Sequence, residues 1–214
     1  MKQRYIVIAF LLSLASSVTA STVDISFTAL PKYQVNGAYV GNVGVTSGTN
    51  QTFDLLCGDL SHTTFVPSGP FSYYVSSLPS LSDVRFTGPD VLTTYQTAAV
   101  LLYEFETLAV VDDSTAGSYQ FAIWKLFTPG AATYGNSTSL LAAAQNTVAQ
   151  GGIQDAYDHF QVYTPTSAAG SNQEFLGMSL TSSLTSTVPE PSSFLLIGCG
   201  LLFIASRFNR RPSI

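Results

Sequence analysis

Cys57 is the residue whose chemistry stands out in this chain of 214 residues. The chain has two cysteines, and the other, Cys199, lies in an apolar C-terminal stretch, so Cys57 has no disulfide partner in the central part of the sequence. A lone thiol of this kind is buried, acts as a nucleophile, or is held in some other covalent bond. At this point the sequence leaves all three interpretations open.

Gln120 lies on a stripe of apolar side chains with helical spacing. Ile123, Trp124 and Phe127 follow it at i+3, i+4 and i+7, which predicts one face of a helix over 118–127. A carboxamide buried on such a face needs hydrogen-bond partners, and at the edge of the stripe it finds them in backbone or water. A cysteine thiolate can also attack a glutamine carboxamide and expel ammonia, which gives an internal thioester. Cys57 and Gln120 are therefore a candidate thioester pair.

The segments around these two residues resemble the signature segments of bacterial thioester domains, also called TQXA domains. They are FDLLCGDL at 53–60 and YQFAIW at 119–124, with Tyr119 where the family has Thr. Looser similarity covers most of residues 35–180. The resemblance implies that Cys57 and Gln120 form the crosslinked pair, and that a partner amine opens the thioester and becomes covalently attached. It further implies single-turnover adhesion without a cofactor, so that the protein is not an enzyme.

Three further residues are candidates for supporting the thioester: Asp59, Tyr119 and Trp124. Asp59 would share a strand face with Cys57 if the strand continued past Gly58. The alternative is a carboxylate that caps a turn. His62 and Tyr95 are weaker candidates for polarising the carboxamide or for protonating the ammonia that leaves.

The elements that must position these residues change in character along the chain. Residues 21–90 alternate with period 2 between Pro- and Gly-marked turns, which predicts strands. Helical spacing predicts helices over 93–107, 118–127 and about 139–150, with an acidic turn over 112–117 before the second. Short strands are expected at 159–163 and 173–180. This order predicts an α+β fold, with a β-sandwich or barrel-like body and an inserted segment of two to three helices, in one exported domain over 21–180.

The N-terminus has the pattern of a secretory signal peptide. Lys2 and Arg4 precede the apolar run 5–14, and small residues lead to Val18-Thr19-Ala20. The apolar run is too short to span a bilayer comfortably. We therefore expect residues 1–20 to direct export and to be removed before Ser21.

The C-terminus combines three ordered elements after a Ser/Thr-rich linker at 181–187. They are Val188-Pro189-Glu190-Pro191, the apolar stretch 194–205, and the cluster Arg207, Arg210 and Arg211. Residues 188–211 thus resemble the PEP-CTERM sorting signal of Gram-negative bacteria, which a membrane exosortase recognises. The resemblance implies a short transmembrane helix over about 192–206, with the arginines on the cytoplasmic side. An ordinary single-pass anchor would have the same topology.

Charge and spacing exclude several functions for the central domain. Residues 21–186 carry twelve Asp and Glu side chains against three Lys and Arg, a formal charge of −9, which excludes nucleic acid as a partner. The two histidines, His62 and His159, and the single cysteine have no metal-ligand spacing, so no metal site is expected.

Two alternatives to the thioester remain. A cysteine hydrolase could be assembled from Cys57, His159 and either Asp155 or Asp158. A matrix protein could bind carbohydrate without covalent chemistry, with Tyr73, Tyr74 and Tyr134 stacking on sugars. The interpretation we favour is an exported, exosortase-sorted surface or matrix protein. It would attach covalently to an amine-bearing surface protein or exopolysaccharide matrix.

Overall fold

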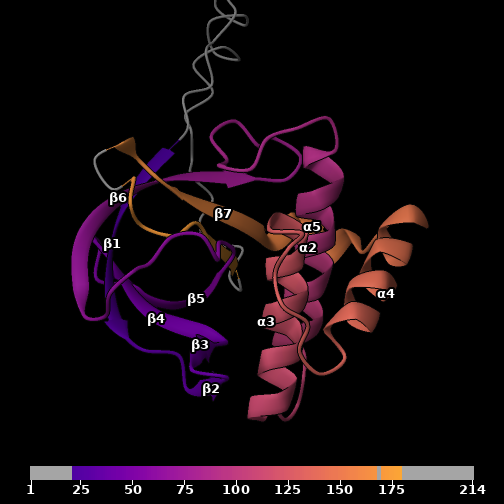
Figure 1. Ribbon diagram of the computed structural model, residues 1–214. Coiled ribbons are helices and arrows are strands. Elements are labelled where there is room, and N and C mark those ends of the chain that lie inside the picture. The colour runs from indigo at the N-terminus through magenta and orange to yellow at the C-terminus, as the bar shows by residue number, and fades with distance from the viewer. Residues whose placement is uncertain (1–20, 168–169, 180–214) are drawn as a thin grey trace, which may run out of the picture. The chain divides into compact units, whose positions relative to one another are not determined.

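The computed structural model describes residues 21–167 and 170–179, which belong to a compact unit within Met1–Ser179. The elements in chain order are β1 (Ser21–Ala29), β2 (Tyr33–Val35), β3 (Ala38–Val40), β4 (Asn42–Ser47), β5 (Thr52–Cys57), β6 (Ser68–Ser77), α2 (Val91–Glu106), α3 (Asp113–Phe127), α4 (Ser137–Ala149), α5 (Gln154–His159), β7 (Phe160–Pro165) and β8 (Phe175–Met178). The helices thus form one block between β6 and β7, and Figure 1 places this block beside the strands.

Six antiparallel strands close into a barrel in the order β1-β4-β5-β8-β7-β6. Successive side chains of a strand point to opposite faces, so alternate residues fill the interior. The pattern is clear in β4, where Val43 and Val45 are buried between half-buried neighbours. The barrel core also holds Ile25, Phe27, Leu55, Tyr73, Tyr163 and Phe175. Because β1 pairs with β6, the barrel is closed and has no free edge strand.

A second core lies between the outer side of the barrel and the helices. Leu56, Val162 and Leu176 point out of the barrel and pack against buried side chains of α2 and α3. Ten residues of α3 are buried, because β2, α2 and α4 all contact this helix. Cys57 contacts both cores. The thiol therefore lies where the barrel meets the helical block.

The expected α+β fold with a barrel-like body is confirmed, with two corrections in the helical block. The stretch 112–117, expected as a turn, forms the first turn of α3, because the Asp112 carboxylate caps the helix by accepting from the Thr115 N–H at 2.7 Å. His159, expected at the start of a strand, is the last residue of the short helix α5. The described residues thus contain four helices rather than two to three.

The predicted signal peptide at 1–20 lies outside the described residues. So do the linker at 181–187, the sorting signal at 188–211 and the transmembrane helix at about 192–206. None of the helices within 21–167 and 170–179 is long and apolar enough to cross a membrane.

Candidate functional site

The fold brings Gln120 directly against Cys57, although 63 residues separate them. Cys57 is the last residue of β5 and pairs with Phe175 of β8. Gln120 lies in the middle of α3 and is 0% exposed. Its amide Nε2 donates a hydrogen bond to the main-chain oxygen of Cys57 at 2.6 Å. The carboxamide is thus fixed beside the residue that carries the thiol.

Two polar atoms at this junction are buried without a hydrogen-bond partner. One is the side-chain oxygen Oε1 of Gln120, and the other is the indole Nε1 of Trp124, one helical turn further along α3. The indole nevertheless lies close enough to Cys57 to lower the pKa of its thiol. A buried polar atom left unpaired costs about 1–3 kcal/mol. The site therefore contains one free acceptor and one free donor on the same face of α3.

The turn that follows Cys57 holds the thiol in a fixed direction. The thiol donates to the main-chain oxygen of Asp59 at 3.1 Å, and the side-chain amide of Gln173 donates to the same oxygen at 2.7 Å. The Gly58 N–H donates to the main-chain oxygen of Glu174 at 2.9 Å. These bonds tie the turn to the segment that enters β8, so the barrel itself determines the position of the sulfur.

Burial raises the pKa of the Cys57 thiol to about 12. Hydrogen bonds from the site lower it and the Asp59 charge raises it further, but both effects are smaller than that of burial. At neutral pH the sulfur is therefore protonated, which suits its role as donor to the Asp59 oxygen. A thiol in this state is a weak nucleophile towards reagents from solution.

The carboxylate of Asp59 contacts groups of the turn that follows it and Arg85, and not the Cys57 thiol. The strand ends at Cys57, so the two side chains do not share a strand face. Oδ1 accepts from the Ser61 N–H at 2.8 Å, as in a turn cap, and Oδ2 contacts His62 and Arg85. Burial acts to raise the pKa of Asp59, but the hydrogen bonds from Ser61 and Arg85 outweigh it and hold the pKa below its ordinary value.

The sequence analysis gave no role to Glu174, a carboxylate that is 0% exposed at the entry to β8. Its Oε1 accepts from the Tyr95 hydroxyl at 2.6 Å, and its Oε2 accepts from the Arg85 main-chain N–H and from Thr164, both at 2.7 Å. Burial raises its pKa despite these bonds. A carboxylate just before the apolar run Phe175-Leu176 was the available signal. Arg85 connects this group to Asp59, so the network fastens both sides of the Cys57 turn.

Tyr119 and Trp124 lie on different sides of α3. The Tyr119 ring packs against Phe105 of α2, with ring centroids 5.6 Å apart, and so faces the neighbouring helix. The Trp124 ring packs edge-on against Phe121, with its indole nitrogen near Cys57. Of the two candidates from this helix, Trp124 is the one whose polar atom reaches the thiol.

The residues of the alternative hydrolase do not come together. Cys57 pairs with Phe175, whereas the residue after His159 pairs with Met178, three positions further along β8. At about 3.3 Å per residue this is a separation of about 10 Å along the strand. His159 instead contacts the main-chain oxygen of Asp155 at 2.9 Å. Within the described residues, no group of three or more His, Cys, Asp or Glu could hold a metal ion.

The tyrosines proposed for stacking on sugars are largely engaged in packing. Tyr73 is 0% exposed and lies inside the barrel between Phe27 and Phe175, so its proposed role in carbohydrate binding is wrong. Tyr134 packs against Phe121, with ring centroids 5.5 Å apart. Tyr74 is half-buried on β6.

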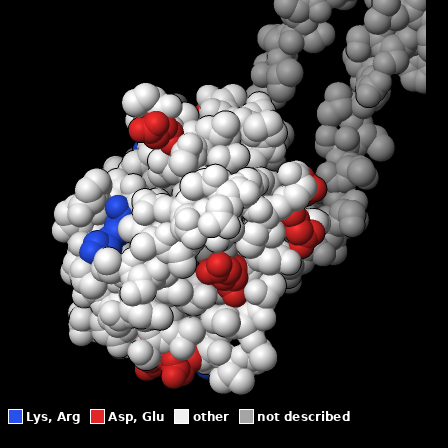
Figure 2. Space-filling model, turned by 90° about the vertical axis from the view of Figure 1, so that its right-hand side faces the viewer, with Lys and Arg blue, Asp and Glu red and all other residues white. Residues whose placement is uncertain are grey.

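Carboxylates dominate the charge on the helical side of the molecule. Figure 2 shows them in separate groups among uncharged side chains, with one larger patch of basic atoms at the left edge of the view. One of the few basic side chains of the domain, Lys125, donates to Thr133 at 2.6 Å. This face therefore presents mainly negative charge to a partner.

Comparison with known proteins gives one sequence match and several structural ones. Residues 187–211 match the PEP-CTERM protein-sorting motif, and no curated protein matches the chain. The N-terminal thioester domain of a surface protein from Clostridium perfringens is similar, with a TM-score of 0.45 and 15% identity over 73% of this chain and 98% of that one. Two structures of the pilus-presented adhesin Cpa give TM-scores of 0.40 at 15% identity, over 75% and 72% of this chain. They are matched over 46% and 45% of their own length, so the chain spans less than half of that adhesin.

The sorting motif indicates an exported, exosortase-processed protein at the surface of a Gram-negative bacterium. This assignment rests on the C-terminal sequence and is independent of the chemistry at Cys57.

Proposed function

We propose that this surface protein forms an internal thioester between Cys57 and Gln120 and uses it to attach covalently to an amine-bearing partner. The observation that carries the proposal is the contact between the two residues. The Gln120 carboxamide is fully buried and donates to the Cys57 main-chain oxygen at 2.6 Å. Holding two reacting groups in place can replace about 7–11 kcal/mol of an activation barrier.

Formation of the thioester joins the Cys57 sulfur to the side-chain carbonyl carbon of Gln120. The S–H bond and the C–N bond break, the C–S bond forms, and the amide nitrogen takes up the thiol proton and leaves as ammonia. The unpaired Trp124 indole N–H is the donor near the sulfur and is suited to stabilise negative charge there during the exchange. Tyr119 faces α2, so its part in this scheme is limited to packing the helix.

Capture of a partner is the second step of the same chemistry. An amine attacks the thioester carbonyl and forms an amide with the Gln120 side chain, while its displaced proton returns to Cys57 as the thiol. Hydrolysis and attack by an amine both release the Cys57 sulfur, and the raised pKa of its thiol makes it a poor leaving group, which slows loss of the thioester to water. Each molecule reacts once, so the protein acts as an adhesin and not as an enzyme.

The tail determines where this chemistry takes place. We infer that residues 1–20 direct export, that 192–206 hold the chain in the membrane, and that an exosortase processes the signal at 188–211. The domain 21–180 then remains at the cell surface or in the extracellular matrix, where an amine-bearing surface protein or exopolysaccharide is the covalent target. The motif match at 187–211 supports the sorting step.

The test is the intact mass of residues 21–186, a chain that keeps every described residue. We expect a mass lower than that of the sequence by one ammonia, and a methylamine adduct after treatment with methylamine. Cys57→Ala should have neither property, whereas His159→Ala, which alters only the alternative hydrolase, should retain both. A wild-type mass equal to that of the sequence, with one titratable thiol, would contradict the proposal. The protein would then be a sorted matrix component without covalent chemistry.

A further inference from the structure

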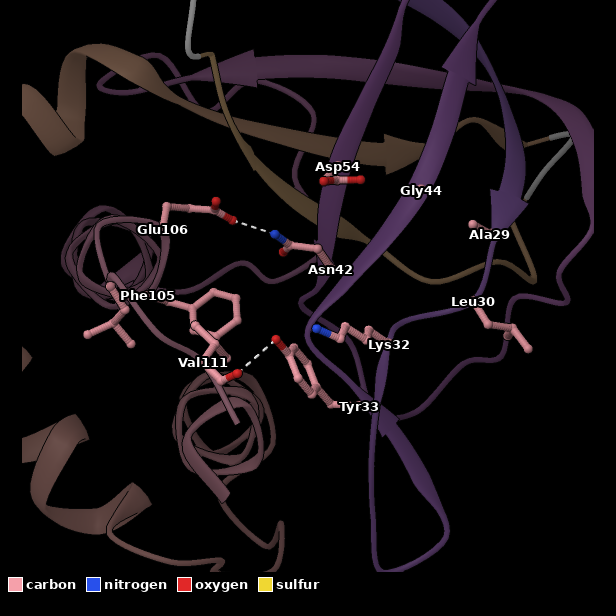
Figure 3. A pocket seen from close by; sticks show the side chains of 11 residues that line it. Ala29, Leu30, Lys32, Tyr33, Asn42, Gly44, Asp54, Phe105, Glu106 and Val111 are labelled. Carbon is pink, nitrogen blue, oxygen red and sulfur yellow. Dashed lines mark hydrogen bonds between the residues drawn. The ribbon is translucent and has the colours of Figure 1, made fainter. Parts of the chain in front are cut away.

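The geometry points to a second binding site, separate from Cys57, that takes a primary ammonium group on an apolar stem. The site is a surface cavity of about 410 Å³ between β4, β5 and the C-terminal end of α2. Figure 3 shows Asp54, Asn42 and Lys32 on the strand side and Phe105 and Glu106 on the helix side. The volume lies within the range of about 300–1,000 Å³ that is usual for small-ligand sites.

Two carboxylates against the single ammonium group of Lys32 leave the cavity with a net negative charge, and neither carboxylate forms an ion pair within the described residues. Asp54 and Glu106 both line it and both keep exposed surface. Burial raises the pKa of Glu106, and the charge of Asp54 raises it further, while a hydrogen bond from Asn42 lowers it. The ion pairs formed by residues 21–167 and 170–179 involve Asp59 and Asp155, not these two. A ligand cation would therefore relieve a repulsion that already exists in the protein.

An aromatic and aliphatic wall adjoins the carboxylates. The hydroxyl of Tyr33 donates to the main-chain oxygen of Val111 at 3.0 Å, which fixes the ring, and Phe105 packs beside it (Figure 3). Leu30 and Leu108, which are 47% and 37% exposed, extend this wall to the rim. Such a surface suits the carbon stem of a ligand rather than a bare inorganic ion.

Lys32 places its own ammonium group against this wall. Its Nζ lies 5.2 Å from the centroid of the Tyr33 ring, within the range of a cation–π contact, instead of pairing with a carboxylate. The carboxylates are thus left for a second cation. In addition, Asn42 donates its Nδ2 to Glu106 at 2.7 Å and leaves its Oδ1 buried without a partner. The acceptors open to a ligand are the carboxylate oxygens of Asp54 and Glu106, which suit the N–H donors of an ammonium group.

The cavity and the thiol lie at different positions along β5. Asp54, the residue of β5 that lines the cavity, comes three positions before Cys57, about 10 Å along the strand, and Cys57 is not part of the lining. Binding in the cavity therefore leaves Cys57 unobstructed. The proposal goes beyond the thioester and does not depend on it.

The experiment uses residues 21–186 with Cys57→Ala, so that acyl transfer cannot contribute to binding. Two probes separate the sources of the ammonium group: Nα-acetyl-lysine N-methylamide represents a protein side chain, and cadaverine represents a free diamine. Nα-acetyl-norleucine N-methylamide has the same stem without the charge. We expect saturable NMR shifts at Tyr33, Asn42 and Glu106 with at least one charged probe and none with the norleucine analogue.

Variants then identify the groups responsible. Asp54→Asn together with Glu106→Gln should weaken binding by about tenfold or more, because both charged acceptors are lost. Asp155→Asn removes an exposed carboxylate on α5 and should leave the affinity unchanged. Absence of saturable binding by both charged probes would overturn the proposal, as would equal binding of the norleucine analogue or an unchanged affinity in the double variant. None of these outcomes bears on the mass measurement, which tests the thioester in the chain that retains Cys57.

Discussion

Gln120→Glu tests how closely the fold encloses the proposed acyl group. The substitution changes the amide to a carboxyl group of the same shape, and we place it in a Cys57→Ala background so that no thioester can form in either protein. The contact that matters joins Nε2 of Gln120 to a main-chain oxygen, which Cys57→Ala leaves in place. Any change in stability then reports on the carboxamide pocket alone.

The magnitude follows from burial and from the 2.6 Å contact. When protonated, the new carboxyl can donate to the same oxygen, so below about pH 4 the loss of stability should be under about 1 kcal/mol. When ionised, it has no proton to donate and lies against a carbonyl oxygen in a site without solvent, so its folded-state pKa is raised. When the carboxyl pKa is higher in the folded state than in the unfolded state, stability is fully present below the unfolded-state pKa of about 4.3. It is lost as the pH rises through the folded-state pKa.

Urea unfolding between pH 4 and pH 7.5 measures this directly. The variant should lose stability relative to the Cys57→Ala parent by about 1.4 kcal/mol per pH unit above about pH 4.3, reaching about 3–4 kcal/mol at pH 7. Gln51→Glu, at an exposed turn position, is the matched control and should show no such slope. A Gln120→Glu deficit that is the same at every pH, or no deficit, would refute the geometry on which the thioester proposal rests.

Two further predictions concern the Cys57 thiol and the ion pair between Asp59 and Arg85. With Cys57 as a free thiol, the rate of alkylation by iodoacetamide should rise about tenfold per pH unit from pH 7 to pH 10 without a plateau. At pH 7 the rate should be about a thousandfold lower than in urea, because the pKa of the folded-state thiol is about 12 rather than 9.0. A plateau below pH 9 in the folded chain would contradict this. Arg85→Leu removes the cation at the buried Asp59 and should lower the unfolding free energy by about 3 kcal/mol at pH 7. The pKa of Asp59 is held below its ordinary value, so the stability that the ion pair contributes is present above about pH 4 and disappears as the pH falls through the folded-state pKa. The loss of stability in Arg85→Leu should therefore shrink in acid. A loss that grows in acid would exclude the ion pair as its cause.

The sequence was most informative where a pattern is local. The i, i+3, i+4, i+7 stripe through Gln120 and Trp124 predicted a buried helix face, and period 2 predicted a strand through Cys57 but not its end there. The expected acidic turn at 112–117 was wrong because Asp112 acts as a helix cap, which depends on a single side-chain bond to Thr115. Local spacing predicts which face of an element is buried, but not where the element begins.

Contacts between distant segments were beyond sequence reasoning. Glu174 meets Tyr95 and Arg85 across separations of 79 and 89 residues, and no spacing rule indicates such a meeting. Asp59 was correctly considered for a turn cap, but its ion pair with Arg85 joins residues 26 positions apart. Tyr73, whose ring was considered for sugar binding in the alternative without covalent chemistry, faces inward because the barrel closes through β6.

The residues that hold the Cys57 turn in place have hydrogen-bond partners for their polar atoms, whereas the residues beside the sulfur do not have partners for all of theirs. Asp59 and Glu174, which hold the turn and the entry to β8, have hydrogen-bond partners on both carboxylate oxygens. Gln120 and Trp124, at the sulfur, each leave one polar atom unpaired. Such an arrangement destabilises the amide form locally, because an amide oxygen is a strong acceptor and is costly to bury unpaired. A thioester oxygen is a weaker acceptor and costs less to bury unpaired, whereas loss of the NH₂ group ends its hydrogen bond to the Cys57 main-chain oxygen. Conversion of the Gln120 amide to a thioester would therefore lower the cost of burying Oε1, so the atom that the fold leaves unpaired is the one that the reaction changes.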